Sequence, residues 1–310
     1  QPANALIPKN AAQVPFTTFT IANGSSAAVT INSVTVERTG LGQDSIFSGV
    51  ILTENGIRLG NTKTLNSNHQ ATLDAAVTVQ PGQTRSFTVA GDIGALTSQS
   101  GQIASLSVVA VNASGAVAGS LPIMGASHTM NNTLTIGTLS VRQGSSDPDS
   151  TTLSKEIGTT NYVGASINAT AGSAEDVWLK SIRWNQSGSA ASSDIANVRT
   201  VIDGTEYTMS IDASGKYYTV SFPGNGVELQ KGFTKEILVK FDVISGSGRN
   251  ANFDIYKAGD VYAVGEVYGY GITADADANT ASATTDASEF ITSDGTASGS
   301  AGTPFFSGSQ

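Results

Sequence analysis

The two histidines are the first residues to consider for chemistry, because an imidazole is the side chain best suited to proton transfer near neutral pH. His69 and His128 are far apart in the sequence, and neither lies in a catalytic motif. A serine hydrolase would also need a nucleophile elbow of the form Gly-x-Ser-x-Gly, which the chain does not contain. We therefore expect neither histidine to lie within reach of both a Ser hydroxyl and a carboxylate, and we expect no enzymatic activity.

Carboxylates and tryptophans are the next candidates, since glycosidases use paired acids and sugar-binding proteins stack rings on tryptophan. The acids fall on predicted loops or strand faces without a surrounding floor of aromatic residues, which indicates solvated surface; they include Glu54, Asp74, Glu175, Asp176, Glu206 and Glu228. Trp178 and Trp184 are an even number of residues apart, so an uninterrupted strand would place both rings on one face. Either the rings pack in the core or they form an exposed platform for a sugar, and core packing is the interpretation we favour.

Calcium is the one cofactor that the acidic residues suggest, because extracellular β-domains are often stiffened by this hard cation on Asp-rich loops. The candidate ligands are Asp147 and Asp149, together with Asp275 and Asp277. Neither run has the spacing of the Asp-x-Asp-x-Asp-Gly loop that ends in Glu. The alternative is that these are acidic turns without a metal, so no cofactor is required.

The overall composition excludes several classes of partner. Cysteine is absent, which excludes disulfides, thiolate metal sites and thiol nucleophiles. The net charge of −9 and the dispersed 16 Lys and Arg residues argue against a nucleic-acid partner. No run reaches the ~18 apolar residues of a membrane span. The chain begins at Gln1, which we interpret as a mature, secreted protein after removal of a signal.

Ser and Thr replace charged residues on the predicted surface: they number 73 of 310, while charged residues make up 13%. Five sequons of the form Asn-x-Ser/Thr permit N-glycosylation, and they lie at Asn23, Asn112, Asn131, Asn168 and Asn185. In a chain with this composition several sequons arise by chance. Attached glycans are therefore an option that the sequence leaves open.

Apolar residues alternate with polar ones at a period of two, as in Val34-Thr35-Val36 and Val239-Lys240-Phe241, which predicts strands throughout. Turn signals such as Asn55-Gly56 and Asp203-Gly204 recur every 8–12 residues. This spacing is typical of hairpins in a β-sandwich.

The same pattern occurs twice, at an offset of 148 residues that becomes 150 toward the end of each copy. Repeats of this kind indicate two copies of one domain. We expect an all-β protein with two tandem immunoglobulin-like β-sandwich domains, at 13–127 and 132–275, between an extended N-terminal segment at 1–12 and an extended tail at 281–310. The predicted cores contain Val34, Val36, Val50, Phe87 and Val89 in the first copy and Ile182, Trp184, Val198, Ile237 and Val239 in the second.

The second copy also carries motifs of a known family: Leu134 to Val141, then Glu175-Asp176-Val177, then Ser193 to Val198 followed by Asp203-Gly204. In these motifs it resembles the repeated immunoglobulin-like modules of bacterial cell-surface and S-layer-like proteins. The first copy is similar only loosely, with Ala28-Val29 and Ser45-Ile46 at the corresponding positions. The resemblance implies a secreted β-sandwich with a structural or adhesive role and no catalytic residues.

The ends of the chain suggest how copies join. Shifting the strand-like run Leu134–Val141 back by 148 residues places it before residue 1, so we predict that the first domain lacks its opening strand. Another copy could complete the sheet by donating a strand, which gives a head-to-tail homopolymer. The candidate contact residues are Leu6, Ile7, Phe290, Ile291, Phe305 and Phe306. The alternative is that the tail folds back on its own second domain.

We accordingly expect a structural subunit of a secreted or cell-surface assembly, in the form of a filament, a pilus-like fibre or an S-layer. Copies of the chain itself are the expected partners, and no nucleic acid or membrane insertion is expected. An adhesin or carbohydrate-binding module is the alternative.

Overall fold

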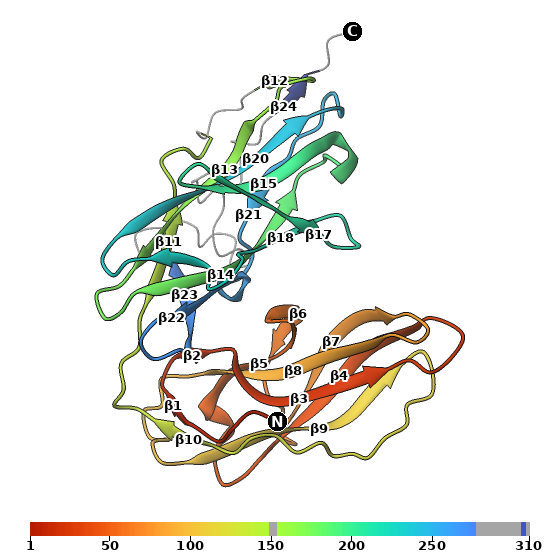
Figure 1. The fold of residues 1–310 in the computed structure, drawn as a ribbon, viewed down its shortest axis with the longest axis vertical. Coiled ribbons are helices and arrows are strands. Elements are labelled where there is room, and N and C mark those ends of the chain that lie inside the picture. Colours follow the sequence, from red (N-terminus) through yellow and green to blue (C-terminus); the bar gives the residue numbers. More distant parts are fainter. Residues whose placement is uncertain (149–153, 277–304, 308–310) are drawn as a thin grey trace. The chain divides into compact units, whose positions relative to one another are not determined.

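The computed structural model describes residues 1–148, 154–276 and 305–307, and strands make up nearly all of their regular secondary structure (Figure 1). The chain divides into two compact units, Gln1–Ile136 and Gly137–Gln310. Residues 1–12, expected as a segment outside the first domain, belong to the first unit. No helix in the described part of the chain has the length and apolarity needed to span a membrane.

The first unit consists of two sheets with the strand orders β1-β10-β9-β4-β7 and β3-β8-β5-β6. Its elements are β1 (Leu6–Pro8), β2 (Ala11–Ala12), β3 (Val14–Ala22), β4 (Val29–Thr39), η1 (Asp44–Ile46), β5 (Phe47–Glu54), β6 (Ile57–Lys63), β7 (Gln70–Val79), β8 (Thr84–Ile93), β9 (Ile103–Ala113) and β10 (His128–Asn131). The inner faces bury the apolar residues of the alternating pattern. All five predicted core residues of this unit are at most 1% exposed.

The second unit has strands in the order β16-β15-β20-β13-β11, and β11 continues through a parallel pair into β23-β22-β14-β18-β17. Its elements are β11 (Leu139–Gln143), β12 (Ser154–Glu156), β13 (Tyr162–Ala171), β14 (Val177–Ser187), η2 (Ser192–Asp194), β15 (Ile195–Ile202), β16 (Thr205–Thr208), β17 (Ser210–Ile211), β18 (Tyr217–Ser221), β19 (Val227–Leu229), β20 (Thr234–Val243), β21 (Asn252–Asp254), η3 (Ala258–Asp260), β22 (Val261–Gly265), β23 (Gly271–Ala276) and β24 (Phe305–Ser307). Strand β24 pairs in parallel with β12.

Matched positions of the two units adopt the same local geometry. The turn residues Asn55 and Gly56 have φ of 51° and 78°, and Asp203 and Gly204 have 50° and 79°. Positive φ at both central residues is the requirement of a type I′ hairpin, which explains the Asn-Gly and Asp-Gly pairs. Bulges also recur, since the register shifts between Ile31 and Ser33 in β4 and between Leu179 and Ser181 in β14.

One predicted core residue is an exception. Val198 is half-buried, whereas Ile182, Trp184, Ile237 and Val239 are buried. The pairing of β15 with β20 shifts between Ala196 and Arg199, which interrupts the alternation next to Val198. A bulge turns a side chain away from the face that the period of two assigns to it.

Candidate functional site: an open strand edge in the first unit

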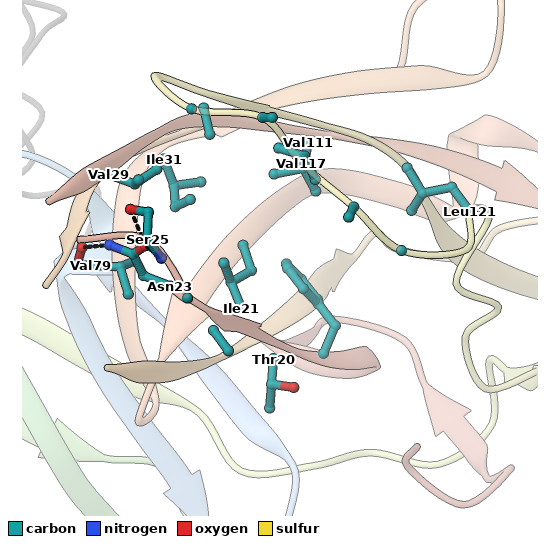
Figure 2. Close-up of a pocket in the computed structure, with 18 of the residues that line it drawn as sticks. Thr20, Ile21, Asn23, Ser25, Val29, Ile31, Val79, Val111, Val117 and Leu121 are labelled. Atoms are coloured by element: carbon teal, nitrogen blue, oxygen red, sulfur yellow. Dashed lines mark hydrogen bonds between the residues drawn. The ribbon is translucent and has the colours of Figure 1, made fainter. Parts of the chain in front are cut away.

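In the first unit an apolar cavity of about 630 Å³ lies along the last residues of β3 (Figure 2). Phe19 to Asn23 form one wall, and the start of β4 contributes Val29 and Ile31. The end of β9 contributes Val111. We call this cavity the β3 groove.

The β3 groove exists because β3 ends its sheet, with β8 as its one neighbour among the described strands. The matched strand in the second unit, β13, has two neighbours, β20 and β11. Strand β11 pairs antiparallel with β13, from Leu139 opposite Ala171 to Gln143 opposite Ile167. Subtracting 148 from 167–171 gives 19–23, the residues that line the β3 groove. The groove therefore lies where a β11-like strand would sit.

Side-chain burial supports this correspondence. Ile21, Val29 and Val111 are half-buried in the first unit. Their counterparts in the second unit are Ala169 and Val177, each 0% exposed, and Val261, which is 2% exposed. Ala169 lies opposite Val141 of β11, whereas no described strand lies opposite Ile21 on the groove side of β3.

The prediction that the first unit has no opening strand is wrong in one respect. Strand β1 pairs in parallel with β10, Leu6 opposite Thr129 and Ile7 opposite Met130, and Ile7 is 2% exposed. Sequence matching missed β1 because only a short connection separates β1 from β3, so the constant offset does not reach it. Strand β1 nevertheless does not pair with β3, which is why the edge at 19–23 stays open.

Polar side chains close the two ends of the β3 groove. The Gln1 amide donates from Nε2 to the Thr18 carbonyl at 2.8 Å and accepts from the Thr18 N–H at 2.9 Å. At the other end, Asn23 Nδ2 donates to the carbonyls of Ala27 and Val79 at 2.8 and 2.9 Å. Thr20 and Ala22, which lie between these ends, are exposed residues.

A loop passes over the β3 groove, and we call its residues Ser114–Pro122 the strap. Val117 and Leu121 of the strap line the cavity, yet they are 52% and 43% exposed (Figure 2). The strap is fixed at its ends, by Ser114 N–H donating to the Thr30 carbonyl and by the bridge between Ile123 and Val108. Residues 115–122 form no backbone hydrogen bond with any described part of the chain. The strap is thus a weakly held cover.

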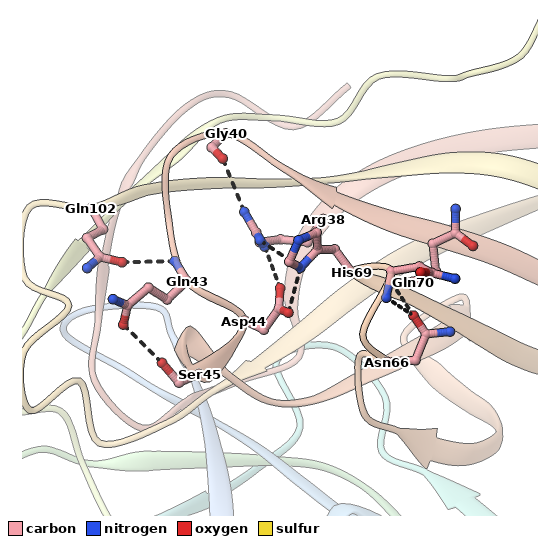
Figure 3. Close-up of polar contacts among 10 residues, drawn as sticks. Arg38, Gly40, Gln43, Asp44, Ser45, Asn66, His69, Gln70 and Gln102 are labelled. Carbon is pink, nitrogen blue, oxygen red and sulfur yellow. Dashed lines mark hydrogen bonds and ion pairs between the residues drawn. The ribbon is translucent and has the colours of Figure 1, made fainter.

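His69 belongs to a polar cluster on the surface of the first unit, with Arg38 and Asp44 (Figure 3). Arg38 Nε donates to Asp44 Oδ1 at 2.6 Å, and His69 Nδ1 lies 2.7 Å from Asp44 Oδ2. Burial alone would raise the pKa of Asp44, but the hydrogen bonds from His69 and Arg38 hold this pKa below its usual value. No Ser hydroxyl is among the described partners of His69.

His128 is a core residue with both ring nitrogens engaged. Its Nδ1 accepts from the Ala5 N–H at 3.1 Å, which leaves Nε2 to donate to the Pro15 carbonyl at 3.0 Å. The ring packs edge-on against Phe16, with centroids 4.6 Å apart, and His128 is 2% exposed. His128 therefore holds the N-terminal residues against β3, a structural role.

The calcium candidates are not gathered into a site by the described chain. Asp147 accepts from Gln143 Nε2 at 3.4 Å, and Asp275 is exposed on β23 opposite Ser140. Asp149 and Asp277 lie outside the described residues. Among the residues that the structure describes, no three His, Asp or Glu side chains come together in a way that could hold a metal ion.

Sequence analysis missed several buried carboxylates, of which two show the cause. Glu175, expected on the solvated surface, is 2% exposed and accepts backbone N–H groups from Gly137, Val267 and Tyr268 at 2.7–3.1 Å. Asp194 is 4% exposed and accepts from the Ala191 N–H. Burial by itself would raise the pKa of Asp194. The hydrogen bond from Ala191 and the further hydrogen bonds that this carboxylate accepts outweigh burial, so the pKa lies below its usual value. A carboxylate that gathers backbone donors from distant segments carries no local sequence signal.

The glycosylation candidates differ in accessibility. Asn23 is 7% exposed and its Nδ2 is engaged, so the folded chain leaves no room for a glycan there. Asn112 is exposed, while Asn131, Asn168 and Asn185 are half-buried. Asn112 is therefore the sequon with the most open side chain.

The two tryptophans do not form a platform. Trp184 is 0% exposed, whereas Trp178 is half-buried on the opposite face of β14. The bulge between Leu179 and Ser181 reverses the alternation between them. The sequence expectation that both rings share one face is wrong for this reason.

The remaining contact candidates lie near the chain ends. Leu6 is 50% exposed on β1. Phe305 and Phe306 belong to β24, which pairs with β12 of the same chain, Lys155 opposite Phe306. Phe290 and Ile291 lie outside the described residues.

Comparisons with known proteins assign no family. No family model matches the chain, and no curated protein matches it. Among solved structures, the calcium-binding domain CBD12 of CALX1.1 has 7% sequence identity and a TM-score of 0.22, covering 81% of this chain and 77% of that one. CBD12 of CALX1.2 has 8% identity and a TM-score of 0.23, covering 86% and 80%. An anti-sigma factor domain-containing protein has 12% identity and a TM-score of 0.21, covering 83% and 80%.

Proposed function

We propose that this chain is a structural subunit of a secreted extracellular assembly, a filament, pilus-like fibre or S-layer, whose copies join head to tail by strand pairing. In this proposal the two units are tandem immunoglobulin-like β-sandwich domains. The observation that carries the proposal is the open edge of β3, which has an apolar groove beside it where the second unit has a paired strand. An unpaired edge of this kind is a template for a strand from another chain.

Strand addition suits a building subunit for physical reasons. Main-chain hydrogen bonds supply affinity, and alternate side chains that enter the groove supply specificity. The contact joins different surfaces of two copies, so it does not close on itself unless the rotation allows, and it extends into a fibre or lattice. The hydroxyl-rich, acidic surface, with a net charge of −9, suits exposure to open water.

The C-terminal strand lends further support to strand pairing. Strand β24 pairs with β12, although Lys155 and its partner Phe306 are 151 positions apart in the sequence. A two-stranded sheet is marginal in water on its own. An identical pairing made between copies in place of one within a copy forms the same contacts, as in domain swapping.

The alternative, a carbohydrate-binding adhesin, has less support. A sugar platform would need exposed, coplanar aromatic rings, and the buried Trp184 cannot provide one with Trp178. We likewise assign no catalytic role to His69 or His128, because the contacts described for each are with the chain's own structural groups.

The test compares the full chain with a variant that lacks residues 281–310, by negative-stain electron microscopy and light scattering over a range of concentrations. We expect ordered polymers of the full chain and folded monomers of the variant, with circular dichroism as the control for folding. A full chain that stays monomeric at every concentration overturns the proposed function. Polymers of the truncated variant overturn joining through the tail.

A further inference from the structure

We infer that the β3 groove accepts residues 287–292 of a second copy, paired antiparallel to Phe19–Asn23 in the position that β11 occupies in the second unit. This inference rests on the proposed function and names the two surfaces that join.

The backbone edge of β3 offers the hydrogen-bonding groups that a new strand needs. Thr18 directs its N–H and C=O away from β8 toward Gln1, and strand alternation places those of Thr20 and Ala22 on the same edge. In the second unit the matching edge of β13 is bonded at both ends, by Gly144 N–H to the Ser166 carbonyl and by Gly172 N–H to the Thr138 carbonyl, each at 2.8 Å. With the offset of 148 residues, Thr20 and Ala22 of β3 correspond to the residues of β13 that lie between these two hydrogen bonds.

The side-chain space of the β3 groove fits alternate apolar residues. In β11, Leu139 and Val141 are 1% and 0% exposed, while Ser140 between them is half-buried. These two side chains complete the core of the second unit. The cavity of about 630 Å³ in the first unit has room for an aromatic ring at one of these positions.

The choice of occupant follows from which apolar segments are already paired. Strand β1 is paired with β10, and β24 is paired with β12. The remaining strand-competent run of the tail is Ser288-Glu289-Phe290-Ile291-Thr292, rich in aromatic and β-branched residues. Residues 277–286 connect it to β23 and could span up to about 33 Å if extended.

The strap has to yield when a strand enters. Residues 115–122 make no backbone hydrogen bond within the described chain, so moving them breaks none. Displaced strap residues Val117 and Leu121 are already half-exposed, which limits the apolar surface that the movement uncovers. The donor strand then takes over the contacts with Ile21, Val29 and Val111.

Alternation provides the first test, made on the full chain. With Phe290 pointing into the groove, Phe290→Ser removes the inserted side chain and abolishes polymers, whereas Ile291→Ser on the outer face leaves them. On the groove side, Ala22→Pro removes an N–H from the free edge while an edge strand tolerates proline there. Ala22→Thr is the matched control because it keeps that N–H, and we expect it to polymerise like the natural chain.

Peptide binding provides the second test and does not depend on polymer formation. The probe is a synthetic peptide with the sequence of residues 285–294, titrated into the full chain carrying Phe290→Ser, whose own donor is disabled. We expect binding that weakens at least tenfold when Ala22→Pro is added, and no weakening with Ala22→Thr. A peptide with Ser at the position of Phe290 should also bind at least tenfold less tightly.

The outcomes separate this inference from the proposed function. Polymers that persist in both Phe290→Ser and Ala22→Pro overturn the groove contact and leave the structural role standing. A natural chain that never polymerises overturns the proposed function, while peptide binding sensitive to Ala22→Pro still supports the groove. A peptide that binds equally to the Ala22→Pro and Ala22→Thr chains overturns the inference.

Discussion

The backbone N–H of Gln13 donates to Oδ1 of Asp92 at 2.8 Å, and the same contact recurs in the second unit between Asn161 and Asp242, also at 2.8 Å. Both donor residues have positive φ, 50° and 57°. The carboxylate therefore fastens an unusual backbone position just before β3 and β13. The contact gives a physical reason for the Asp that the two sequence copies share.

The two carboxylates lie in different surroundings, which predicts opposite mutational effects. Burial raises the pKa of Asp92 even though the Gln13 N–H and the Arg58 charge lower it. Hydrogen bonds from Asn161 and Asn197 lower the pKa of Asp242. The raised pKa means that ionised Asp92 opposes folding at neutral pH, and the lowered pKa means that ionised Asp242 favours it.

We therefore expect Asp92→Asn to leave the stability at pH 7 unchanged or improved, and Asp242→Asn to reduce it by about 1 kcal/mol. Since the Asp242 contribution exists above the unfolded pKa near 4 and is lost as pH falls through the lowered folded pKa, the second variant should differ less from the natural chain at pH 3 than at pH 7. Urea unfolding at both pH values measures this. An equal loss in the two variants at pH 7 would contradict the assignment.

The Arg38–Asp44–His69 cluster predicts a second pH-dependent effect. Hydrogen bonds keep the pKa of Asp44 below its usual value against the effect of burial, so its contribution to stability is present above about pH 4 and is lost in acid. Asp44→Asn should cost less than about 1 kcal/mol at pH 7, because the pair is partly exposed, and less again at pH 3. Circular dichroism is the suitable probe, since the first unit contains no Trp or Tyr.

The two tryptophans predict a clear difference in fluorescence. Trp184 is fully buried and Trp178 is half-buried, so acrylamide should quench the Trp184→Phe variant strongly and the Trp178→Phe variant weakly. Trp184→Ala should destabilise the second unit by about 3–5 kcal/mol, whereas Trp178→Ala should cost much less. Equal quenching of the two Phe variants would show that the bulge in β14 does not separate the rings.

The tryptophans also mark the limit of what alternation predicts. The period of two identified the strands and nearly all the named core residues, because burial on one sheet face is a local pattern. It failed for Trp178 and Val198, both of which lie beside bulges. A bulge depends on how two distant strands register, and that information is not contained in either strand alone.

The candidate site, too, could be predicted from the sequence only in part. Aligning the two copies predicted that the first unit lacks its opening strand, and in the described part of the chain β3 has no strand in the place that β11 takes beside β13. The alignment missed β1, whose short connection breaks the constant offset. It also missed Glu175, because the three N–H donors of that carboxylate come from residues 137, 267 and 268.

Glu175 and the strap predict different rates of amide hydrogen exchange at the edges of the two units, because they hold the chain with different firmness. In the second unit the turn after β22 is held by Glu175 Oε2, which accepts from Val267 and Tyr268, so these two amides should exchange slowly with solvent deuterium. The amides of residues 115–121 in the strap have no such acceptor in the described chain and should exchange at close to unprotected rates.

Replacing the carboxylate tests the cause of that difference. Glu175→Gln leaves an amide group facing one of the backbone donors, so the exchange of Val267 and Tyr268 should accelerate and the second unit should lose about 1–3 kcal/mol. Glu266→Gln is the matched control, because Glu266 is exposed and close in sequence, and it should change neither quantity. Hydrogen exchange read by NMR at single residues measures both effects in one sample. Strap amides protected as well as Val267 would contradict the weak hold on the strap, because a well-bonded cover would have to break hydrogen bonds before any strand could enter the β3 groove.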